Sequence, residues 1–165
     1  SDDLILARAS TTLPLLRKDF TVDEYQLVEA KAFGADVILL IAAVLTREEI
    51  KKLSELAKSL RLEVLVEIHN REELEKAIMP GVDLIGVNNR NLKTFEVNPE
   101  YSNQLAEHIP DAFVKISESG LDSAETVSAL QQHGFKGFLM GEYFMKSDDP
   151  ENTMKNFIKK LNGWN

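Results

Sequence analysis

The sequence predicts an α/β fold in which parallel strands alternate with helices. Short apolar runs recur six times along the 165 residues, a segment with helical periodicity follows each run, and no linker divides the chain. This alternation is typical of parallel strands that are covered by helices. Hydrophobic residues make up 44% and charged residues 28%, as in an ordinary globular domain, so we expect residues 1–165 to form a single domain.

Strands are expected where short runs are rich in branched apolar residues. The expected strands are 13–16, 37–41, 64–66, 84–87, 113–116 and 138–140. The expected helices are 23–33, 46–60, 71–79, 99–108, 123–133 and 151–161, with residues 2–9 as one more helix or its remnant. Thr46 and Glu49 match a capping box at the clearest helix, and Gly34, Gly81 and Gly134 follow helices, as C-terminal stops do.

The composition excludes several classes of function. The absence of cysteine removes disulfides, thiolate metal sites and a cysteine nucleophile, and three scattered histidines do not suggest a metal site. A net charge of −8 argues against nucleic acid as a partner but is compatible with a small anionic substrate. Because no signal peptide is visible and no apolar run reaches the about 20 residues of a membrane span, we expect a cytoplasmic protein without a membrane partner.

The residues that end the strands distinguish between two α/β architectures. A doubly wound sheet gathers its ligand residues at one switch point, whereas a (β/α)8 TIM barrel spreads them over the ends of many strands. Every expected strand except 37–41 runs into polar or charged residues, and the pattern Gly-x-Gly-x-x-Gly is absent. We therefore expect a member of the TIM-barrel class. Since a full barrel needs eight units and about 250 residues, six units predict an incomplete barrel or a sheet that stays open.

Two charged residues at strand ends are candidates for catalysis. Lys18 follows the first strand, where partial desolvation makes a lysine usable as a general acid. Glu67 follows Val66 in the third strand, and a carboxylate that faces a barrel interior needs a cationic partner, which Lys18 could provide. The alternatives are a solvated lysine paired with Asp19 and an ion pair that is only structural.

Two glycine turns predict an anion site. Glu118, Ser119 and Gly120 end the fifth strand, and Gly141 and Glu142 end the sixth. In barrels that bind phosphate, the loops after the last two strands donate backbone N–H groups, and glycine lets the backbone approach the anion. The carboxylate of Glu142 is unsuited to an anion site, so its backbone would have to serve.

Polar and aromatic residues near other strand ends suit substrate recognition. Asn88 and Arg90 provide an amide and a guanidinium group, which recognise hydroxyl and carboxylate groups, although asparagine also favours turns. Phe20 could stack on an aromatic substrate, but an apolar residue at this position is more often part of a core. His69 is interpreted as structural.

Five motifs occur in one order from about residue 13 to the end of the chain. They are Leu16-Arg-Lys-Asp-Phe20 followed by Asp23-Glu-Tyr-Gln26, Leu65-Val-Glu-Ile-His69, Ile85-Gly-Val-Asn-Asn-Arg-Asn-Leu-Lys-Thr-Phe95, Ser117-Glu-Ser-Gly120 and Leu139-Met-Gly-Glu-Tyr-Phe-Met145. Together they resemble the indole-3-glycerol phosphate synthase family.

The resemblance implies a (β/α)8 lyase of tryptophan biosynthesis. Its members convert 1-(2-carboxyphenylamino)-1-deoxyribulose 5-phosphate into indole-3-glycerol phosphate, CO2 and water without a metal or an organic cofactor. The resemblance implies that Lys18 protonates the ketone oxygen during ring closure. Of the two carboxylates, Glu67 and Glu118, one would tune this lysine and the other would help proton transfer. It assigns substrate binding to Phe20, Asn88 and Arg90, and phosphate binding to Ser119, Gly120, Gly141 and Glu142.

The sequence departs from the family pattern at its start. The family's first strand carries a Glu-x-Lys pair with catalytic roles, and this pair does not occur here. The chain resembles units three to eight, so we expect it alone to be weakly active or inactive and to self-associate through exposed strand edges. Two alternatives stay open, namely a non-catalytic half-barrel that binds a phosphorylated ligand and a sibling phosphate-binding barrel isomerase.

Overall fold

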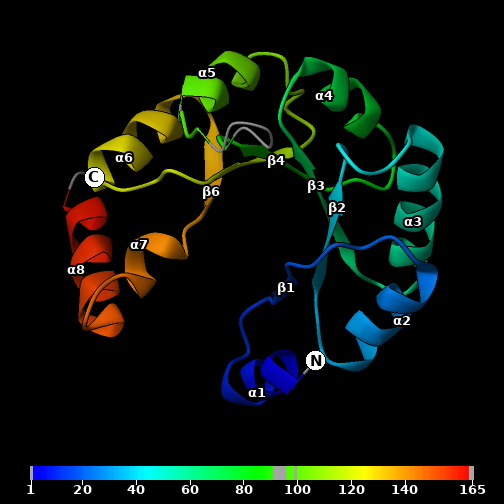
Figure 1. The fold of residues 1–165 in the computed structure, drawn as a ribbon, viewed down its shortest axis with the longest axis horizontal. Helices are drawn as coiled ribbons and strands as arrows, with labels where there is room; N and C mark the ends of the chain where they lie inside the picture. The colour runs from blue at the N-terminus through cyan, green and yellow to red at the C-terminus, as the bar shows by residue number, and fades with distance from the viewer. Residues whose placement is uncertain (1, 91–95, 99, 164–165) are drawn as a thin grey trace. The chain divides into compact units, whose positions relative to one another are not determined.

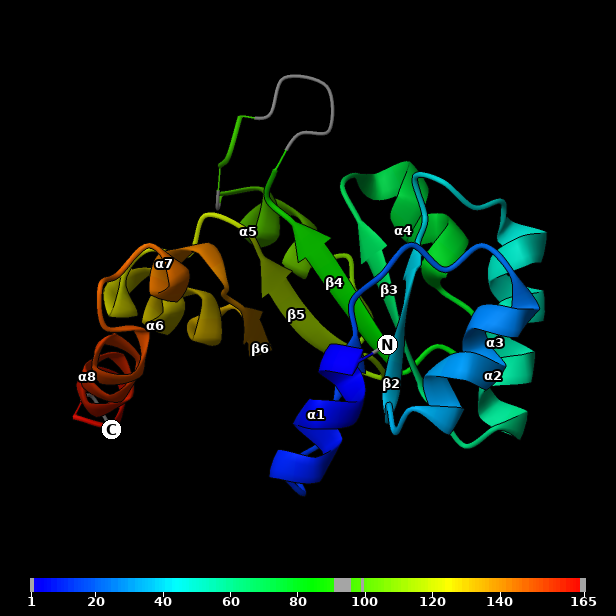
Figure 2. The same cartoon turned by 60° about the horizontal axis from the view of Figure 1, so that its bottom comes forward.

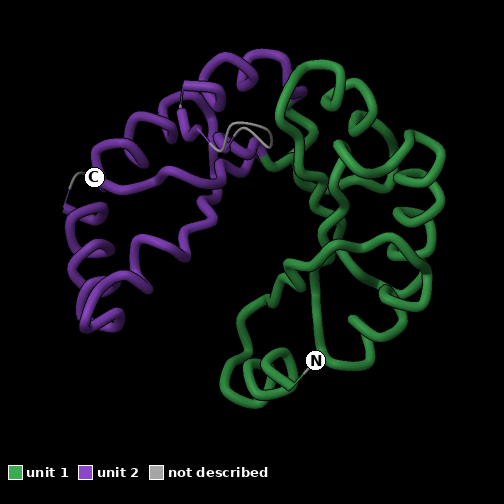
Figure 3. The backbone as a smooth tube through the Cα atoms, viewed as in Figure 1, with its two compact units in different colours: residues 1–86, 111–113 green, residues 87–110, 114–165 purple. Residues whose placement is uncertain are grey.

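A computed structural model describes residues 2–90, 96–98 and 100–163 (Figure 1). Residues 91–95, which complete one of the five motifs, lie outside the described residues. The chain divides into two compact units, residues 1–86 with 111–113 and residues 87–110 with 114–165 (Figure 3). The expectation of a single domain stays a prediction.

The described part of the chain contains six strands, and the strand order of the sheet follows the chain. The strands are β1 (Leu16–Arg17), β2 (Val37–Ile41), β3 (Glu63–Ile68), β4 (Leu84–Asn88), β5 (Val114–Glu118) and β6 (Phe135–Leu139). The helices are α1 (Asp2–Ser10), α2 (Glu24–Ala32), α3 (Arg47–Ser59), α4 (Arg71–Ala77), α5 (Glu100–Ala106), α6 (Ala124–Gln132), α7 (Glu142–Met145) and α8 (Pro150–Asn162). The predicted alternation of strand and helix is therefore confirmed.

In the first unit, β1, β2 and β3 are parallel neighbours, and Ile41 at the end of β2 lies opposite Glu67 in β3. Helices α2, α3 and α4 lie on the same side of β2 and β3 (Figure 2). Helix α3 begins at the predicted capping box, because the Thr46 side chain accepts a hydrogen bond from the Glu49 backbone and the Glu49 side chain returns to Thr46. The core of this unit is apolar and includes Leu27, Ile38, Leu40, Ile50, Leu65 and Leu74.

Two aspartates, each just before a strand, tie their loops to the strand that precedes them in the chain. Asp36 accepts hydrogen bonds from the Leu15 backbone N–H and from Arg8, both at 2.8 Å. Asp83 accepts from the Val64 backbone N–H at 2.8 Å and pairs with the Lys58 ammonium group at 2.8 Å. A charged acceptor strengthens a backbone hydrogen bond, so these contacts hold the amino-terminal ends of the strands in register.

In the second unit, β5 and β6 are parallel, with a register irregularity between Lys115 and Ile116. Helices α6, α7 and α8 enclose an aromatic cluster in which the rings of Tyr143, Phe144 and Phe157 meet edge to face or tilted. Ala124, Val127, Phe144 and Phe157 form the buried part of this cluster. The cluster fixes the short helix α7, which carries Glu142.

The structure corrects several predicted boundaries. Strand β1 covers only residues 16–17, because Leu13 is exposed and Pro14 has no N–H group to donate to a sheet. Strand β6 begins at Phe135, three residues before the predicted run, and β5 continues to Glu118. Helix α7 was not predicted, since its four residues are too few to show a helical period.

Candidate active site

Lys18 and Glu67 meet in the first unit, at the carboxyl ends of β1 and β3. The Lys18 ammonium nitrogen lies 3.1 Å from Glu67 Oε2, although β2 lies between the two strands. The long, flexible side chain of Lys18 spans this interval. The Glu67 side chain is 5% exposed and that of Lys18 is 44% exposed. The predicted pairing is confirmed, and it places a buried carboxylate against a cation that solvent can reach.

The residues on either side of Lys18 make contacts of their own. The Arg17 guanidinium group pairs with Glu29 on α2 at 2.6 Å and with Asp19 at 3.4 Å. Phe20 is 63% exposed, so the core position is wrong for this residue. Its carbonyl oxygen accepts a hydrogen bond from Gln26 at 2.8 Å, which holds the loop and presents the ring to solvent.

His69 and Glu73 continue the charged group beyond Glu67. His69 Nε2 lies 3.5 Å from Glu67 Oε1, and His69 Nδ1 lies 3.1 Å from Glu73 Oε2. The His69 backbone N–H also donates to Glu73 Oε2 at 2.8 Å, and the Asn70 amide donates to the other oxygen at 2.9 Å. Burial acts to raise the pKa of Glu73, but the hydrogen bonds and charge of His69 and the amide of Asn70 outweigh it and hold that pKa below its ordinary value.

Arg90 and Glu142 meet in the second unit. The Arg90 guanidinium group pairs with Glu142 Oε2 at 3.2 Å, and Lys146 pairs with Oε1 of the same carboxylate at 2.5 Å. The Lys146 ammonium group, and after it Arg90, hold the pKa of Glu142 below its ordinary value. Asn88 is half-buried at the end of β4, where its Oδ1 accepts from the Arg90 backbone N–H at 3.0 Å. This arrangement gives Glu142 a counter-charge on each oxygen, so its carboxylate is neutralised locally.

Asn89, between Asn88 and Arg90, lies at the candidate site and is not singled out by the sequence patterns. It is fully buried, and its side chain closes a ring of hydrogen bonds with Ser102 and Ser117. Its Nδ2 also donates to the Ser119 carbonyl oxygen at 3.1 Å, and its backbone N–H donates to the Glu118 carbonyl oxygen at 2.9 Å. Asn89 therefore connects the end of β4 to the turn that follows β5.

The turn at Ser119 and Gly120 has two consecutive residues with positive φ, +69° and +68°. Serine rarely adopts this conformation, and the bond from Asn89 to its carbonyl oxygen is one of the contacts that hold it there. A Cβ atom placed on Gly141 would meet nothing within 4 Å, so the space in front of the second predicted glycine turn is open. Glu118 is 2% exposed at the end of β5.

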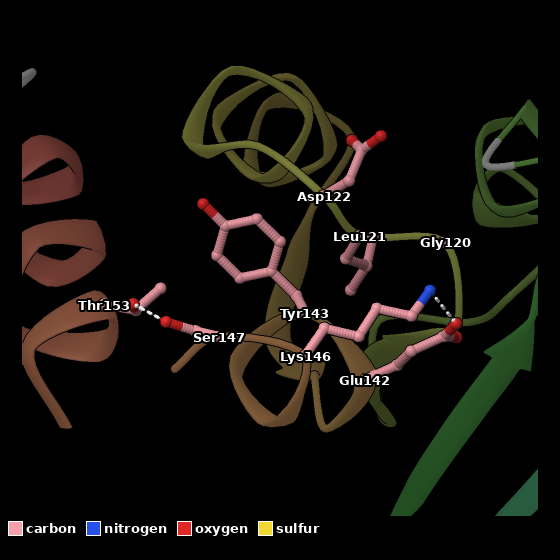
Figure 4. Close-up of a pocket in the computed structure, with 8 residues that line it drawn as sticks. All are labelled: Gly120, Leu121, Asp122, Glu142, Tyr143, Lys146, Ser147 and Thr153. Carbon is pink, nitrogen blue, oxygen red and sulfur yellow. Dashed lines mark hydrogen bonds and ion pairs between the residues drawn. The ribbon is translucent and has the colours of Figure 1, made fainter. Parts of the chain in front are cut away.

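An open pocket of about 550 Å³ lies beside these turns (Figure 4). Gly120 and Glu142, two of the predicted phosphate residues, line it together with Asp122, Tyr143, Lys146 and Ser147. The Lys146 ammonium group points to Glu142, and the Ser147 hydroxyl group meets that of Thr153 at 2.7 Å (Figure 4). The Lys146 ammonium group is paired with Glu142, and Asp122 adds a second carboxylate to the lining, so an anion here would have to be held by the backbone of the glycine turns.

Two further features are absent from residues 2–90, 96–98 and 100–163. No group of three or more metal-ligating side chains that could hold an ion occurs there. No helix in this part of the chain is long and apolar enough to cross a membrane.

Known proteins resemble this chain in sequence over almost its whole length. The family described as indole-3-glycerol phosphate synthase matches residues 1–157. An indole-3-glycerol phosphate synthase of Bacteroides thetaiotaomicron is 49% identical over 159 residues, which cover 96% of this chain and 61% of that protein. One of Campylobacter jejuni is 49% identical over 152 residues, covering 92% and 59%. The chain therefore spans about three fifths of the length of these relatives.

Solved structures resemble the fold at much lower sequence identity. KGPDC from Streptococcus mutans superposes with a TM-score of 0.79 at 15% identity, covering 96% of this chain and 78% of that one. The 3-hexulose-6-phosphate synthase from Salmonella typhimurium gives a TM-score of 0.80 at 14% identity, with the same coverage. These likenesses confirm the predicted fold class, an incomplete barrel of six βα units.

Proposed function

Because the chain belongs to the indole-3-glycerol phosphate synthase family, we propose that it carries the lyase chemistry of that family. The substrate would be 1-(2-carboxyphenylamino)-1-deoxyribulose 5-phosphate, a small phosphorylated molecule, and the products would be indole-3-glycerol phosphate, CO2 and water. The observation that carries the proposal is the contact of 3.1 Å between Lys18 and the buried Glu67, since both residues lie in segments that match family motifs.

In the proposed reaction, the first unit provides the acid. The ring carbon that bears the carboxylate attacks the substrate ketone, and Lys18 donates a proton to the ketone oxygen as the new bond forms. Loss of CO2 restores the aromatic ring, and loss of water then completes the indole. Glu67 balances the charge of the ammonium group before the transfer, so we assign it the tuning role. Phe20 would pack against the anthranilate ring with its exposed face.

The second unit would contribute binding groups and the second carboxylate. We assign proton transfer to Glu118, which is buried at the end of β5. Asn88 and Arg90 would bind the substrate, and the backbone of Ser119, Gly120, Gly141 and Glu142 would hold its phosphate. The open space before Gly141 and the neutralised carboxylate of Glu142 support this use of the backbone. We propose no metal and no organic cofactor for the reaction, and we expect the protein to work in the cytoplasm.

The lyase proposal is tested by adding the part of a relative that this chain does not cover. The chain is fused to the segment that precedes the matched region in the Bacteroides thetaiotaomicron protein, and indole fluorescence is followed with the substrate above. We expect turnover by the fusion and little or none by the 165-residue chain. Lys18→Met in the fusion should lower the rate by about 10²- to 10⁴-fold. A folded fusion without turnover would contradict the proposal.

A non-catalytic role is a second candidate, and the pocket beside Gly120 and Glu142 favours it for the chain alone. In that role the chain would bind a phosphorylated ligand, without nucleic acid as a partner. Calorimetric titration of the chain with indole-3-glycerol phosphate separates the two functions. If the chain binds this ligand but the fusion shows no turnover, only the non-catalytic role is supported. Self-association through the edges of β1 and β6, the two ends of the strand order, is also part of this proposal and is measured by sedimentation.

A further inference from the structure

A chain of four charged or ionisable side chains crosses the first unit. It runs from Glu73 on α4 through His69 and Glu67 to Lys18, with contacts of 3.1, 3.5 and 3.1 Å between successive side chains. Glu73, His69 and Glu67 have side chains that are 12%, 10% and 5% exposed, so three of the four members are nearly buried. Lys18 is the only member of this chain of contacts with substantial access to solvent.

The carboxylate of Glu73 fixes the orientation of the His69 ring. Glu73 Oε2 accepts from the backbone N–H of His69, and the same oxygen faces Nδ1 of its ring. Because the pKa of Glu73 is held below its ordinary value, this oxygen is an acceptor at neutral pH, and Nδ1 must carry the proton that it accepts. The ring is therefore held from one side, and its other nitrogen points away from α4.

That other nitrogen, Nε2, is the part of the residue that a packing role does not explain. It is buried and makes no hydrogen bond within the described part of the chain, yet it lies 3.5 Å from Glu67 Oε1. A proton carried by Nε2, in addition to the one on Nδ1, would be donated to Oε1 and would give this nitrogen its hydrogen bond. Contacts of this kind are often long in a free enzyme and tighten in the substrate complex.

We propose that His69 is a positioning residue for the Lys18–Glu67 pair. Anchored by Glu73 through Nδ1, it presents Nε2 to one oxygen of Glu67 and leaves the other oxygen for Lys18. Glu67 and Glu73 are the charged groups that face the ring, from β3 and α4, and Lys18 lies beyond Glu67. Without this anchor the Glu67 carboxylate could rotate, and the position of the Lys18 ammonium group would follow it. This role rests on the proposed function, in which Lys18 is the acid.

Nuclear magnetic resonance of the chain with labelled lysine and histidine tests the proposal without substrate. In the native chain we expect a proton on Nδ1 of His69, in a long-range proton–nitrogen spectrum. His108 and His133 are exposed. Their signals in the same sample show the spectrum of a histidine ring in contact with solvent, with which that of His69 is compared. A bare Nδ1 on His69 would overturn the proposal.

A matched set of variants tests whether His69 affects the position of Lys18. Asparagine at position 69 keeps an amide near Glu73 but does not reach Glu67, whereas glutamine places an amide near the position of Nε2. His69→Asn should therefore move the Lys18 Cε resonance, and His69→Gln should return it towards the native position. The exposed control His108→Asn should leave it in place.

A purely structural role predicts that neither His69 variant moves the Lys18 resonance, and that result would overturn the proposal. Should His69→Asn fail to fold, Glu73→Ala removes the anchor while it keeps the ring, and it should move the same resonance. Since no substrate is present, an immobile Lys18 signal contradicts the role of His69 alone. Absent turnover in the fusion contradicts only the proposed lyase function.

Discussion

Asn89 donates a hydrogen bond from its buried amide to the carbonyl oxygen of Ser119, whose φ is +69°. The same amide group faces Ser117 Oγ at 3.1 Å, while Ser102 donates to Asn89 Oδ1 from both its N–H and its hydroxyl group. Asn89 thus uses both its amide nitrogen and its amide oxygen in hydrogen bonds. It stabilises Ser119 in a backbone conformation that serine seldom adopts.

Asn89→Asp should destabilise the chain by about 3 kcal/mol, because it replaces a buried donor with a carboxylate that faces acceptors. Urea unfolding at pH 7 measures the loss. Asn156→Asp, at an exposed position on α8, is the matched control and should change stability by less than about 0.5 kcal/mol. Equal losses for the two variants would show that the Asn89 contacts do not stabilise the fold.

How far the sequence predicts this site depends on the residue. Strand ends could be recognised from polar residues after apolar runs, and Lys18 and Glu67 were paired correctly because a buried carboxylate requires a cation. Asn89 was missed because a run of two amides does not reveal which one turns inwards. In the structure Asn89 is fully buried, whereas Asn88 is half-buried. The His69 contacts depend on helix α4 returning Glu73 to the strand end, which no local pattern shows.

The Lys18–Glu67 contact should appear as a coupling energy. Lys18→Met leaves a buried carboxylate with one cation fewer, and Glu67→Gln removes the charge that the lysine faces. In a double-mutant cycle measured by urea unfolding, the two losses should exceed that of the double variant by about 1 kcal/mol. The modest size reflects the exposure of Lys18 to solvent screening. Additive losses would argue against the pair as a stabilising unit.

Glu73 should contribute stability in a pH-dependent way. Its pKa in the folded chain is below the ordinary value of 4.5, so its ionised form favours folding above that pH. This contribution is lost as the pH falls through the lowered pKa. Glu73→Gln should therefore cost most near neutral pH, and the difference from the native chain should shrink in acid. Glu72→Gln at the neighbouring exposed position is the control, and its cost should not follow the same trend.

Gly141→Ala should separate anion binding from folding. Its φ is −112°, and an added Cβ would meet nothing within 4 Å, so stability should change by less than about 0.5 kcal/mol. The methyl group would occupy the open space through which a phosphate reaches the backbone. Calorimetric titration with indole-3-glycerol phosphate should show weaker binding than in the native chain, by about tenfold. Unchanged binding would place the phosphate elsewhere.

Alanine substitutions at Gly34 and Gly81 form a matched pair that tests how firmly Arg8 of α1 is held. Both have φ near +93°, so alanine at either position carries the same backbone strain. At Gly81 the added Cβ would lie 3.4 Å from Ser54, an ordinary contact, whereas at Gly34 it would lie 2.7 Å from Arg8 Cγ. Arg8 cannot move freely, because its guanidinium group binds Asp36 and the carbonyl oxygens of residues 11 and 13.

Gly34→Ala should therefore cost about 1–2 kcal/mol more than Gly81→Ala in urea unfolding, since it adds the displacement of Arg8 to the strain. In an Arg8→Gly background the three obstructing atoms, Cβ, Cγ and Cδ of Arg8, are gone, and the two glycine variants should then cost the same. If the difference persisted in that background, backbone strain at Gly34, and not the anchored arginine, would be its cause.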